Sequence, residues 1–303
     1  MRRPVAVALA WMTRISDLLA AGKTYSFEFF PPKSDAEQAT LLRTIRDLEP
    51  LHPSWVSVTY RGGPASRRRT FDLVTGMHHA TSLVPMAHLT CVSHSRLELA
   101  EILVDYRKAG IENLMALGGD PPVSPEEGPG ELRYALELVE LARAIGGFSI
   151  GVAAHPAGHP AAPDIETDRD HLAAKLSLAD FAVTQFFFDV DLYRRLLEDL
   201  DRRRLEKPVV PGIMPVTSLN SVPRMAQMGS PVPAWAVERL ERAAGRGGAE
   251  AVRAEGVAMA TELCQALLDA GAPGLHFYTL NRSTATREIY RALGLAPTLS
   301  AAG

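Results

Sequence analysis

The sequence predicts an α/β fold, a (βα)₈ or TIM barrel, as one domain with extra helices before the eighth strand. Apolar runs of strand length alternate with amphipathic helical patterns eight times along the 303 residues. The runs are mostly continuously apolar, which indicates strands buried on both faces. An open doubly wound sheet is the competing architecture, but the turn after the first strand reads Pro31-Pro32-Lys33 and lacks a dinucleotide-binding glycine fingerprint.

The expected strands are apolar segments rich in β-branched and aromatic residues. They lie at 25–30, 55–60, 83–90, 112–117, 148–154, 181–188, 209–214 and 275–280. Helices are expected after the capping boxes that begin at Ser34 and Ser95, and over 70–81, 132–144, 164–179, 191–203 and 283–293. Residues 217–269 should form several helices, with breaks at 229–231 and 245–248.

The first 22 residues are expected to form an N-terminal helical extension, followed by a catalytic barrel domain over 23–303. Ile15, Leu18 and Leu19 share one face of a helix that Gly22 can end. Residues 1–11 superficially resemble a signal peptide, but no convincing cleavage site follows, so we expect none. Met12 is an alternative start.

Composition points to an ordinary globular protein of a reducing cytoplasm. The net charge is -3 and the sequence has no long basic run, so it does not predict a binding surface for nucleic acid or an anionic membrane. No apolar run has the length of a membrane span. Cys91 and Cys264 are far apart, and no metal-ligand spacing occurs, so we expect neither a disulfide framework nor a metal. The sequence leaves homo-oligomerisation open.

Glu28 lies inside the first strand among aromatic residues. An ionised carboxylate is costly to bury there, so Glu28 should either find partners or hold its proton near neutrality. Holding the proton would suit a general acid. A buried salt bridge with Lys33 or an arginine is the alternative, and the first strand alone does not decide between them.

Polar residues end six of the expected strands. Because active sites of (βα)₈ barrels lie at the carboxyl ends of the strands, this regularity predicts a site there. The six residues are Glu28, Thr59, His88, Asp120, His155 and Gln185.

Seven segments, in order, resemble the motifs of the bacterial methylenetetrahydrofolate reductases, and the likeness extends from about residue 13 to 295. The segments are 26–33, 57–60, 87–90, 119–122, 184–189, 211–215 and 276–282. The resemblance implies a cytoplasmic barrel enzyme of one-carbon metabolism and methionine biosynthesis. Such an enzyme reduces 5,10-methylenetetrahydrofolate to 5-methyltetrahydrofolate with NAD(P)H through bound FAD, so its partners are folate and nicotinamide.

The resemblance also implies roles for individual residues. Glu28 matches the acid that protonates N10 of the folate, and Asp120 matches a carboxylate that binds the pterin ring and tunes the flavin. Gln185 matches an amide that holds the pterin, and Arg282 is a partner for the glutamate tail of folate. Leu219 lies in the loop 215–220 that covers folate or nicotinamide, where many relatives carry an aromatic residue.

The flavin side departs from the family pattern. The positions implied to contact FAD are Thr59, His88, Gly119, Asp120, His155, His159, Asp170 and Lys175, the last two within a slip of one residue. Gly118 stands in place of a usual arginine, His155 in place of a tyrosine or phenylalanine, and residues 61–66 also differ. A lost arginine removes a charge-assisted contact worth about 1.5–3 kcal/mol, although Arg61 or Arg67 could substitute.

Two alternatives therefore stay open. One is a flavin-independent reductase in which hydride passes directly from nicotinamide to folate. The other is a non-catalytic folate-binding paralogue, which is disfavoured because a mere binder has no use for a buried acid at Glu28.

Overall fold

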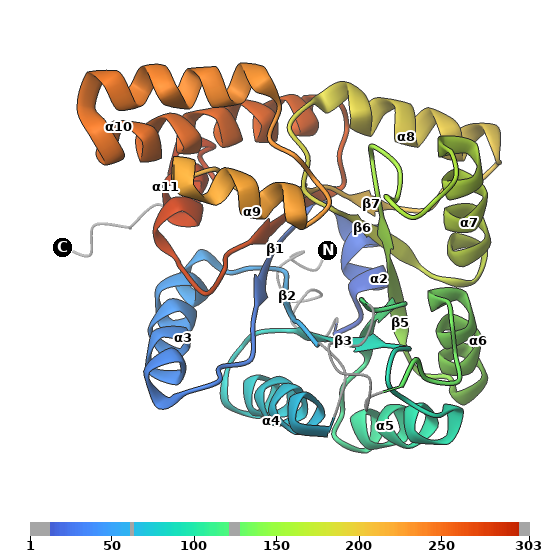
Figure 1. The fold of residues 1–303 in the computed structure, drawn as a ribbon. Helices are drawn as coiled ribbons and strands as arrows, with labels where there is room; N and C mark the ends of the chain where they lie inside the picture. Colours follow the sequence, from blue (N-terminus) through green and yellow to red (C-terminus); the bar gives the residue numbers. More distant parts are fainter. Residues whose placement is uncertain (1–12, 61–63, 121–127, 297–303) are drawn as a thin grey trace, which may run out of the picture.

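The computed structural model describes residues 13–60, 64–120 and 128–296, and in this part of the chain a ring of helices surrounds parallel strands (Figure 1). The strands are β1 (Thr24–Phe29), β2 (Trp55–Val58), β3 (Pro85–Thr90), β4 (Asn113–Leu117), β5 (Ser149–Ala154), β6 (Phe181–Thr184), β7 (Val209–Val210), β8 (Gly212–Ile213) and β9 (Gly274–Tyr278). Every pair of neighbours is parallel, in the order β7-β6-β5-β4-β3-β2-β1-β9-β8. The predicted (βα)₈ barrel is confirmed.

The barrel closes at Pro211. The expected seventh strand, 209–214, is divided there into two short strands. β7 pairs with β6, whereas β8 pairs with β9, and we call the junction between these two edges the seam. Proline has no N–H to donate, and its carbonyl instead accepts a hydrogen bond of 2.9 Å from the backbone N–H of His276. The Thr184 hydroxyl of β6 accepts from the backbone N–H of Gly212 at 2.9 Å, which joins the two edges.

The helices agree with the sequence pattern in kind and order. They are α2 (Ile15–Ala21), α3 (Asp35–Leu48), α4 (Pro64–Ala80), α5 (Arg96–Lys108), α6 (Ala135–Ile145), α7 (Ile165–Leu178), α8 (Val190–Arg202), α9 (Val222–Gln227), α10 (Ala234–Asp269) and α11 (Thr284–Ala292). Short 3₁₀ turns lie at Glu49–Leu51 (η1) and Leu219–Ser221 (η3). Ser95 and Glu98 form the expected capping box. None of the described helices combines the length and apolar character that crossing a bilayer requires.

Helix α2 closes the amino-terminal end of the barrel. Ile15, Leu18 and Leu19 pack against side chains in the barrel interior, including Trp55 and Phe181. The helix therefore completes the inner core.

The long α10 is a helical hairpin that packs beside the seam. Gly247 and Gly248 have non-helical backbone angles, as the expected break at 245–248 requires. After this break the helix runs against the loop that follows β8: a Cβ added to Gly256 would lie 1.9 Å from the Val216 carbonyl oxygen. A side chain at residue 256 would thus displace the loop 215–220.

Candidate active site

Glu28 projects from β1 into the barrel near its carboxyl end and is only 6% exposed. Its Oε2 atom lies 3.4 Å from the Ser57 hydroxyl, 3.5 Å from His88 Nε2 and 3.7 Å from His276 Nε2. Among the described residues no lysine or arginine pairs with this carboxyl group. The buried salt bridge with Lys33 is therefore not observed, and Glu28 has polar partners without a fixed positive charge.

His276 is the neighbour of Glu28 that the strand-end pattern missed, because it lies inside β9 rather than at its end. Its ring is 1% exposed and stacks on Trp55, with centroids 4.7 Å apart and planes at 11°. Its Nδ1 lies 2.8 Å from the Ser26 hydroxyl, and its Nε2 lies 3.4 Å from the Ser57 hydroxyl. The matched motif 276–282 gave a family signal at this position but no role.

The loop after β9 fixes the end of β1. The Thr279 hydroxyl donates to the Glu28 carbonyl at 2.6 Å. Asn281, with a left-handed φ of 56°, accepts from the Phe30 N–H at 2.8 Å and donates to the Phe30 carbonyl at 2.9 Å. These bonds hold the backbone from the Glu28 carbonyl to Phe30, which limits movement at the end of β1.

Tyr278 connects Glu28 with the end of β6. Its hydroxyl donates to the Thr184 carbonyl at 2.7 Å, and its ring occupies the space that Gly212 leaves open. Burial, and then the charge of Glu28, raise the pKa of Tyr278 well above its ordinary value. Gln185, which follows Thr184 in the chain, donates from its side-chain amide to the Met228 carbonyl at 3.0 Å. Glu28 and Gln185 thus lie at the same mouth of the barrel, as predicted.

Two side chains of β3 carry buried polar atoms that make no hydrogen bond within the described residues: Thr90 Oγ1, and His88 Nε2, which lies 3.5 Å from Glu28 Oε2. Burial lowers the pKa of His88 to about 4, although the nearby Glu28 opposes this shift, so the ring is neutral at pH 7. Nearby, Gly119 has φ +91°, and a Cβ there would lie 2.5 Å from Val92 Cγ1. Buried polar groups are normally satisfied, so the two orphaned atoms are candidates for contact with a ligand.

The end of β5 brings His155, His159 and Lys175 together. The rings of His155 and His159 meet edge to face at 4.6 Å. Burial, and then electrostatic repulsion from His159, Lys175 and Arg169, lower the pKa of His155 to about 3. Burial lowers the pKa of Lys175, whose Nζ donates to the Ala153 carbonyl at 2.9 Å.

Asp168 and Asp170 differ in their surroundings. Asp168 is buried and pairs with Arg169 at 2.7 Å, and its charge opposes the lowering of the Lys175 pKa. Asp170 is exposed and pairs with Arg203 at 2.8 Å, between α7 and the end of α8. The structure therefore brings Asp168, two residues earlier in the sequence, to the group around Lys175, and the helical register of α7 is the reason.

The other predicted positions lie nearer solvent. Thr59 follows β2 and is half-buried, whereas Asp120 follows β4 and is exposed. Arg282 is exposed in the loop after β9, and Leu219 is half-buried in η3 against the core cluster around Phe186. Arg61 and the segment 121–127 lie outside the described residues.

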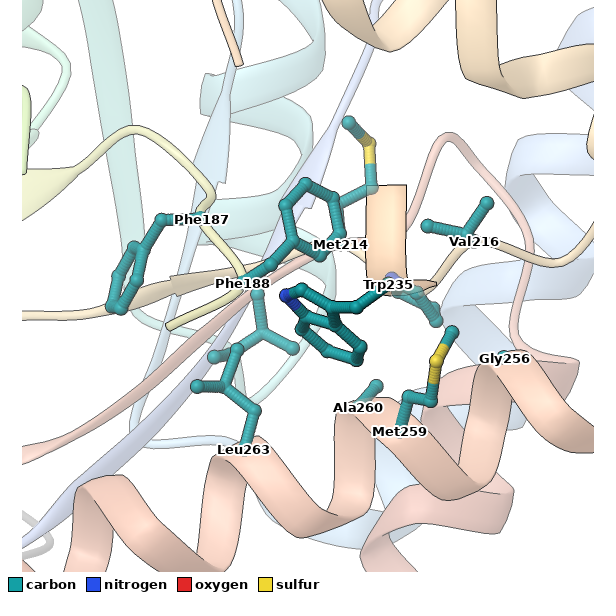
Figure 2. A pocket seen from close by; sticks show the side chains of 11 residues that line it. Phe187, Phe188, Met214, Val216, Trp235, Gly256, Met259, Ala260 and Leu263 are labelled. Atoms are coloured by element: carbon teal, nitrogen blue, oxygen red, sulfur yellow. The ribbon is translucent and has the colours of Figure 1, made fainter. Parts of the chain in front are cut away.

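Figure 2 shows a different feature, an apolar hollow between the ends of β6 and β8 and the helix α10. Phe188, Met214, Trp235 and Met259 are among the side chains that line it. Its volume of about 20 Å³ admits roughly one water molecule. It is therefore too small for a pterin or a flavin, and it shares no lining residue with the Glu28 cluster.

The arrangement suits proton transfer at the mouth of the barrel. A nearly buried carboxyl group has hydroxyl and imidazole neighbours but no cation, and neutral histidines and a lysine lie at the ends of β3 and β5. Among the described residues, no three histidine, cysteine, aspartate or glutamate side chains are grouped so that they could hold a metal ion.

Comparisons with known proteins give one result. The family model described as methylenetetrahydrofolate reductase matches residues 14–294. The 5,10-methylenetetrahydrofolate reductases of Pectobacterium carotovorum and Escherichia coli are each 36% identical to this chain, the first covering 90% of both chains and the second 90% of this chain and 92% of its own. Methylenetetrahydrofolate reductase (NADH) 1 of Arabidopsis thaliana is 32% identical over 93% of this chain and 50% of its own.

A solved structure shares the fold. It is an uncharacterized protein from Clostridium thermocellum that binds two copies of 5-methyl-5,6,7,8-tetrahydrofolic acid, with a TM-score of 0.63 and 13% identity over 93% of this chain and 97% of that one.

Proposed function

This chain belongs to the methylenetetrahydrofolate reductase family, and we propose that it is an oxidoreductase that reduces 5,10-methylenetetrahydrofolate to 5-methyltetrahydrofolate with a reduced nicotinamide as the electron source. The observation that supports the proposal best is Glu28: a carboxyl group that is 6% exposed, at the mouth of the barrel, with no cationic partner among the described residues.

Glu28 is proposed to start the folate reaction. Its proton passes to N10, the bond between N10 and the methylene carbon breaks, and the bonding electrons go to N10. The methylene carbon is left as an iminium on N5, and hydride addition to that carbon gives the methyl group. The position of Glu28 supports this role, because the carboxyl group lies at the mouth of the barrel and no lysine or arginine among the described residues pairs with it.

Gln185, Asp120, Arg282 and Leu219 are proposed to bind the folate. Gln185 lies across the mouth from Glu28 and can turn its amide from the Met228 carbonyl toward a pterin ring. Asp120 and Arg282 are exposed in the loops that follow β4 and β9, at the carboxyl-terminal end of the barrel, where they can meet the pterin and the glutamate carboxylates. Leu219 supplies an apolar contact from the loop 215–220.

FAD is proposed as the bound cofactor, and it would carry the hydride between nicotinamide and folate. The fit rests on His88 Nε2 and Thr90 Oγ1, which have no hydrogen-bond partner among the described residues, and on Gly119, where the side chains of Val92 and Thr90 leave no room for a Cβ. Thr59, His155, His159 and Lys175 complete the proposed cradle. Asp168, which lies beside Lys175, is a better candidate for it than the exposed Asp170.

Gly118 favours a second candidate, a flavin-independent reductase, because no side chain at this position can bind a flavin. Two measurements distinguish the candidates. The absorption spectrum of the purified protein, before and after incubation with excess FAD, reports bound flavin. NADH oxidation with methylenetetrahydrofolate, followed in the same samples, reports turnover. Flavin bands with turnover support the FAD enzyme, turnover without flavin supports direct transfer, and absence of turnover in both samples contradicts the proposed function.

A further inference from the structure

The side of Glu28 that faces the barrel interior has two hydrogen-bonding groups from neighbouring strands. Ser57 of β2 and His276 of β9 approach the same oxygen, Oε2, at 3.4 and 3.7 Å. Both distances are longer than a normal hydrogen bond. Both residues are fully or almost fully buried, so water does not replace them easily.

The hydrogen bonds of His276 assign its tautomer. The Ser26 hydroxyl lies 2.8 Å from His276 Nδ1 and 3.4 Å from the Leu275 carbonyl, its only other acceptor in the described structure. A serine hydroxyl has one proton, and the two contacts compete for it. We place the proton in the shorter contact, so that Nδ1 accepts, and this choice of tautomer is part of the proposal below. In a neutral imidazole the other nitrogen then carries the proton. His276 therefore presents an N–H donor toward Ser57 and Glu28, and stacking on Trp55 fixes the direction of that donor.

We propose that His276 and Ser57 are positioning residues that stabilise the carboxylate of Glu28 once its proton has passed to the folate. The two contacts are long in this structure, and they shorten when the carboxyl group gives up its proton to the folate, since charge-assisted hydrogen bonds are shorter and stronger. Stabilisation that appears only as charge develops accelerates the proton transfer. This inference rests on the proposed function, and it assigns two residues a part in the acid step.

Other groups that face the Glu28 carboxyl do not substitute for this pair. His88 of β3 lies 3.5 Å away and is neutral, but it is also a candidate flavin contact. Tyr278 of β9 commits its hydroxyl proton to the Thr184 carbonyl. Trp55 meets His276 with its ring face. Within the described part of the chain, Ser57 and His276 alone thus reach the carboxyl group from the barrel interior and have no proposed contact with folate or flavin.

The experiment compares His276→Phe and Ser57→Ala with the wild type. Phenylalanine can keep the stack on Trp55 and loses the donor. Met115→Leu is the matched control, because Met115 lies in the barrel interior and makes only apolar contacts there. Infrared difference spectroscopy follows the Glu28 carboxyl band, identified by its absence in Glu28→Gln, as the pH is raised. This measurement needs no folate turnover.

Removing a donor to the anion makes Glu28 hold its proton to higher pH. The midpoint of the Glu28 titration should therefore rise by about one pH unit in each variant and stay unchanged in Met115→Leu. Folate reduction should fall about tenfold to a hundredfold, while NADH oxidation with an artificial acceptor persists.

An unchanged or lowered midpoint in both variants overturns the inference, whatever the rates are. If His276→Phe does not fold, Ser57→Ala alone decides in the same way. If the midpoint rises in the variants but the wild-type protein does not reduce methylenetetrahydrofolate, the contacts of Ser57 and His276 with Glu28 are supported and only the proposed function is contradicted.

Discussion

The side-chain carbonyl of Asn113 accepts a hydrogen bond of 2.8 Å from the backbone N–H of Ile15, and its amide donates to the Thr13 carbonyl at 2.7 Å. Asn113 thereby satisfies the amino-terminal end of α2, where Arg14, the N-cap, offers no side-chain cap. A side chain of the barrel strand β4 therefore holds α2, the helix that closes the amino-terminal end of the barrel.

Asn113→Ala should destabilise the protein by about 1–3 kcal/mol, because the Ile15 N–H and the Thr13 carbonyl lose their partners. Urea unfolding followed by circular dichroism measures the change. Val104→Ala, at an exposed position of α5, is the control and should have little effect. Equal midpoints for Asn113→Ala and the wild type would show that α2 docks through its apolar face alone.

Glu28→Gln should lower folate reduction by at least about a hundredfold, the usual scale for removing a general acid. Glutamine is nearly isosteric and less costly to bury than a carboxylate, so the fold should persist. NADH oxidation with an artificial acceptor should survive, since it needs no proton on folate; in protein without flavin, nicotinamide binding is the control instead. Near wild-type folate reduction would make Glu28 a structural residue.

Gly118→Arg should tighten FAD binding about tenfold to a hundredfold, the equivalent of one charge-assisted contact of about 1.5–3 kcal/mol. Of the described atoms, a Cβ at this position comes within 4 Å of the Ala135 backbone nitrogen alone, at 3.9 Å, so these residues leave room for a Cβ. Titration of the apoprotein with FAD, followed by flavin fluorescence, gives the affinity. Gly118→Ala is the control and should leave it unchanged; equal affinities for arginine and alanine would contradict the prediction.

Acid should destabilise the protein between about pH 6.5 and 4, because the buried His88 and the half-buried His155 are neutral in the folded protein. The pKa is lowered to about 4 for His88 and about 3 for His155, so the unfolded chain binds more protons in this window and stability falls as the pH falls. Each histidine contributes up to about 1.4 kcal/mol per pH unit.

His155→Tyr should remove its share of this slope, whereas His79→Gln, at an exposed position, should not change it. Urea unfolding at a series of pH values provides the slopes. A His155→Tyr slope equal to that of the wild type would mean that His155 is protonated in the folded protein.

Gly256→Ala should destabilise the protein by about 1–3 kcal/mol, as overpacking commonly does, and should raise the KM for folate or NADH by moving the loop 215–220. Gly245→Ala, in the same helix with open space around it, is the matched control and should stabilise by about 0.5–1 kcal/mol. Steady-state kinetics and chemical denaturation of both variants measure the KM and the free energy of unfolding. A KM and a stability of Gly256→Ala equal to those of the wild type would show that the loop 215–220 adapts to the added methyl group.

Local patterns in the sequence were sufficient to predict the alternation of strands and helices, the capping box at Ser95 and the barrel class. The reason is that each depends on residues close in the chain: apolar runs, period and caps. The polar residues at strand ends were also readable, because parallel strands in a barrel place their carboxyl ends together, as the contact between Glu28 and His88 shows.

Only the tertiary structure decided which side chains meet. His276 is 248 positions from Glu28 in the chain, and the pairing of β1 with β9 alone brings the two together. The division of the seventh strand at Pro211 also follows from the tertiary structure, because β7 pairs with β6 and β8 pairs with β9. Asp168 is buried whereas Asp170 is exposed, because the packing of α7 selects which face of the helix is buried. Such contacts depend on closure, register and helix rotation, which no local pattern encodes.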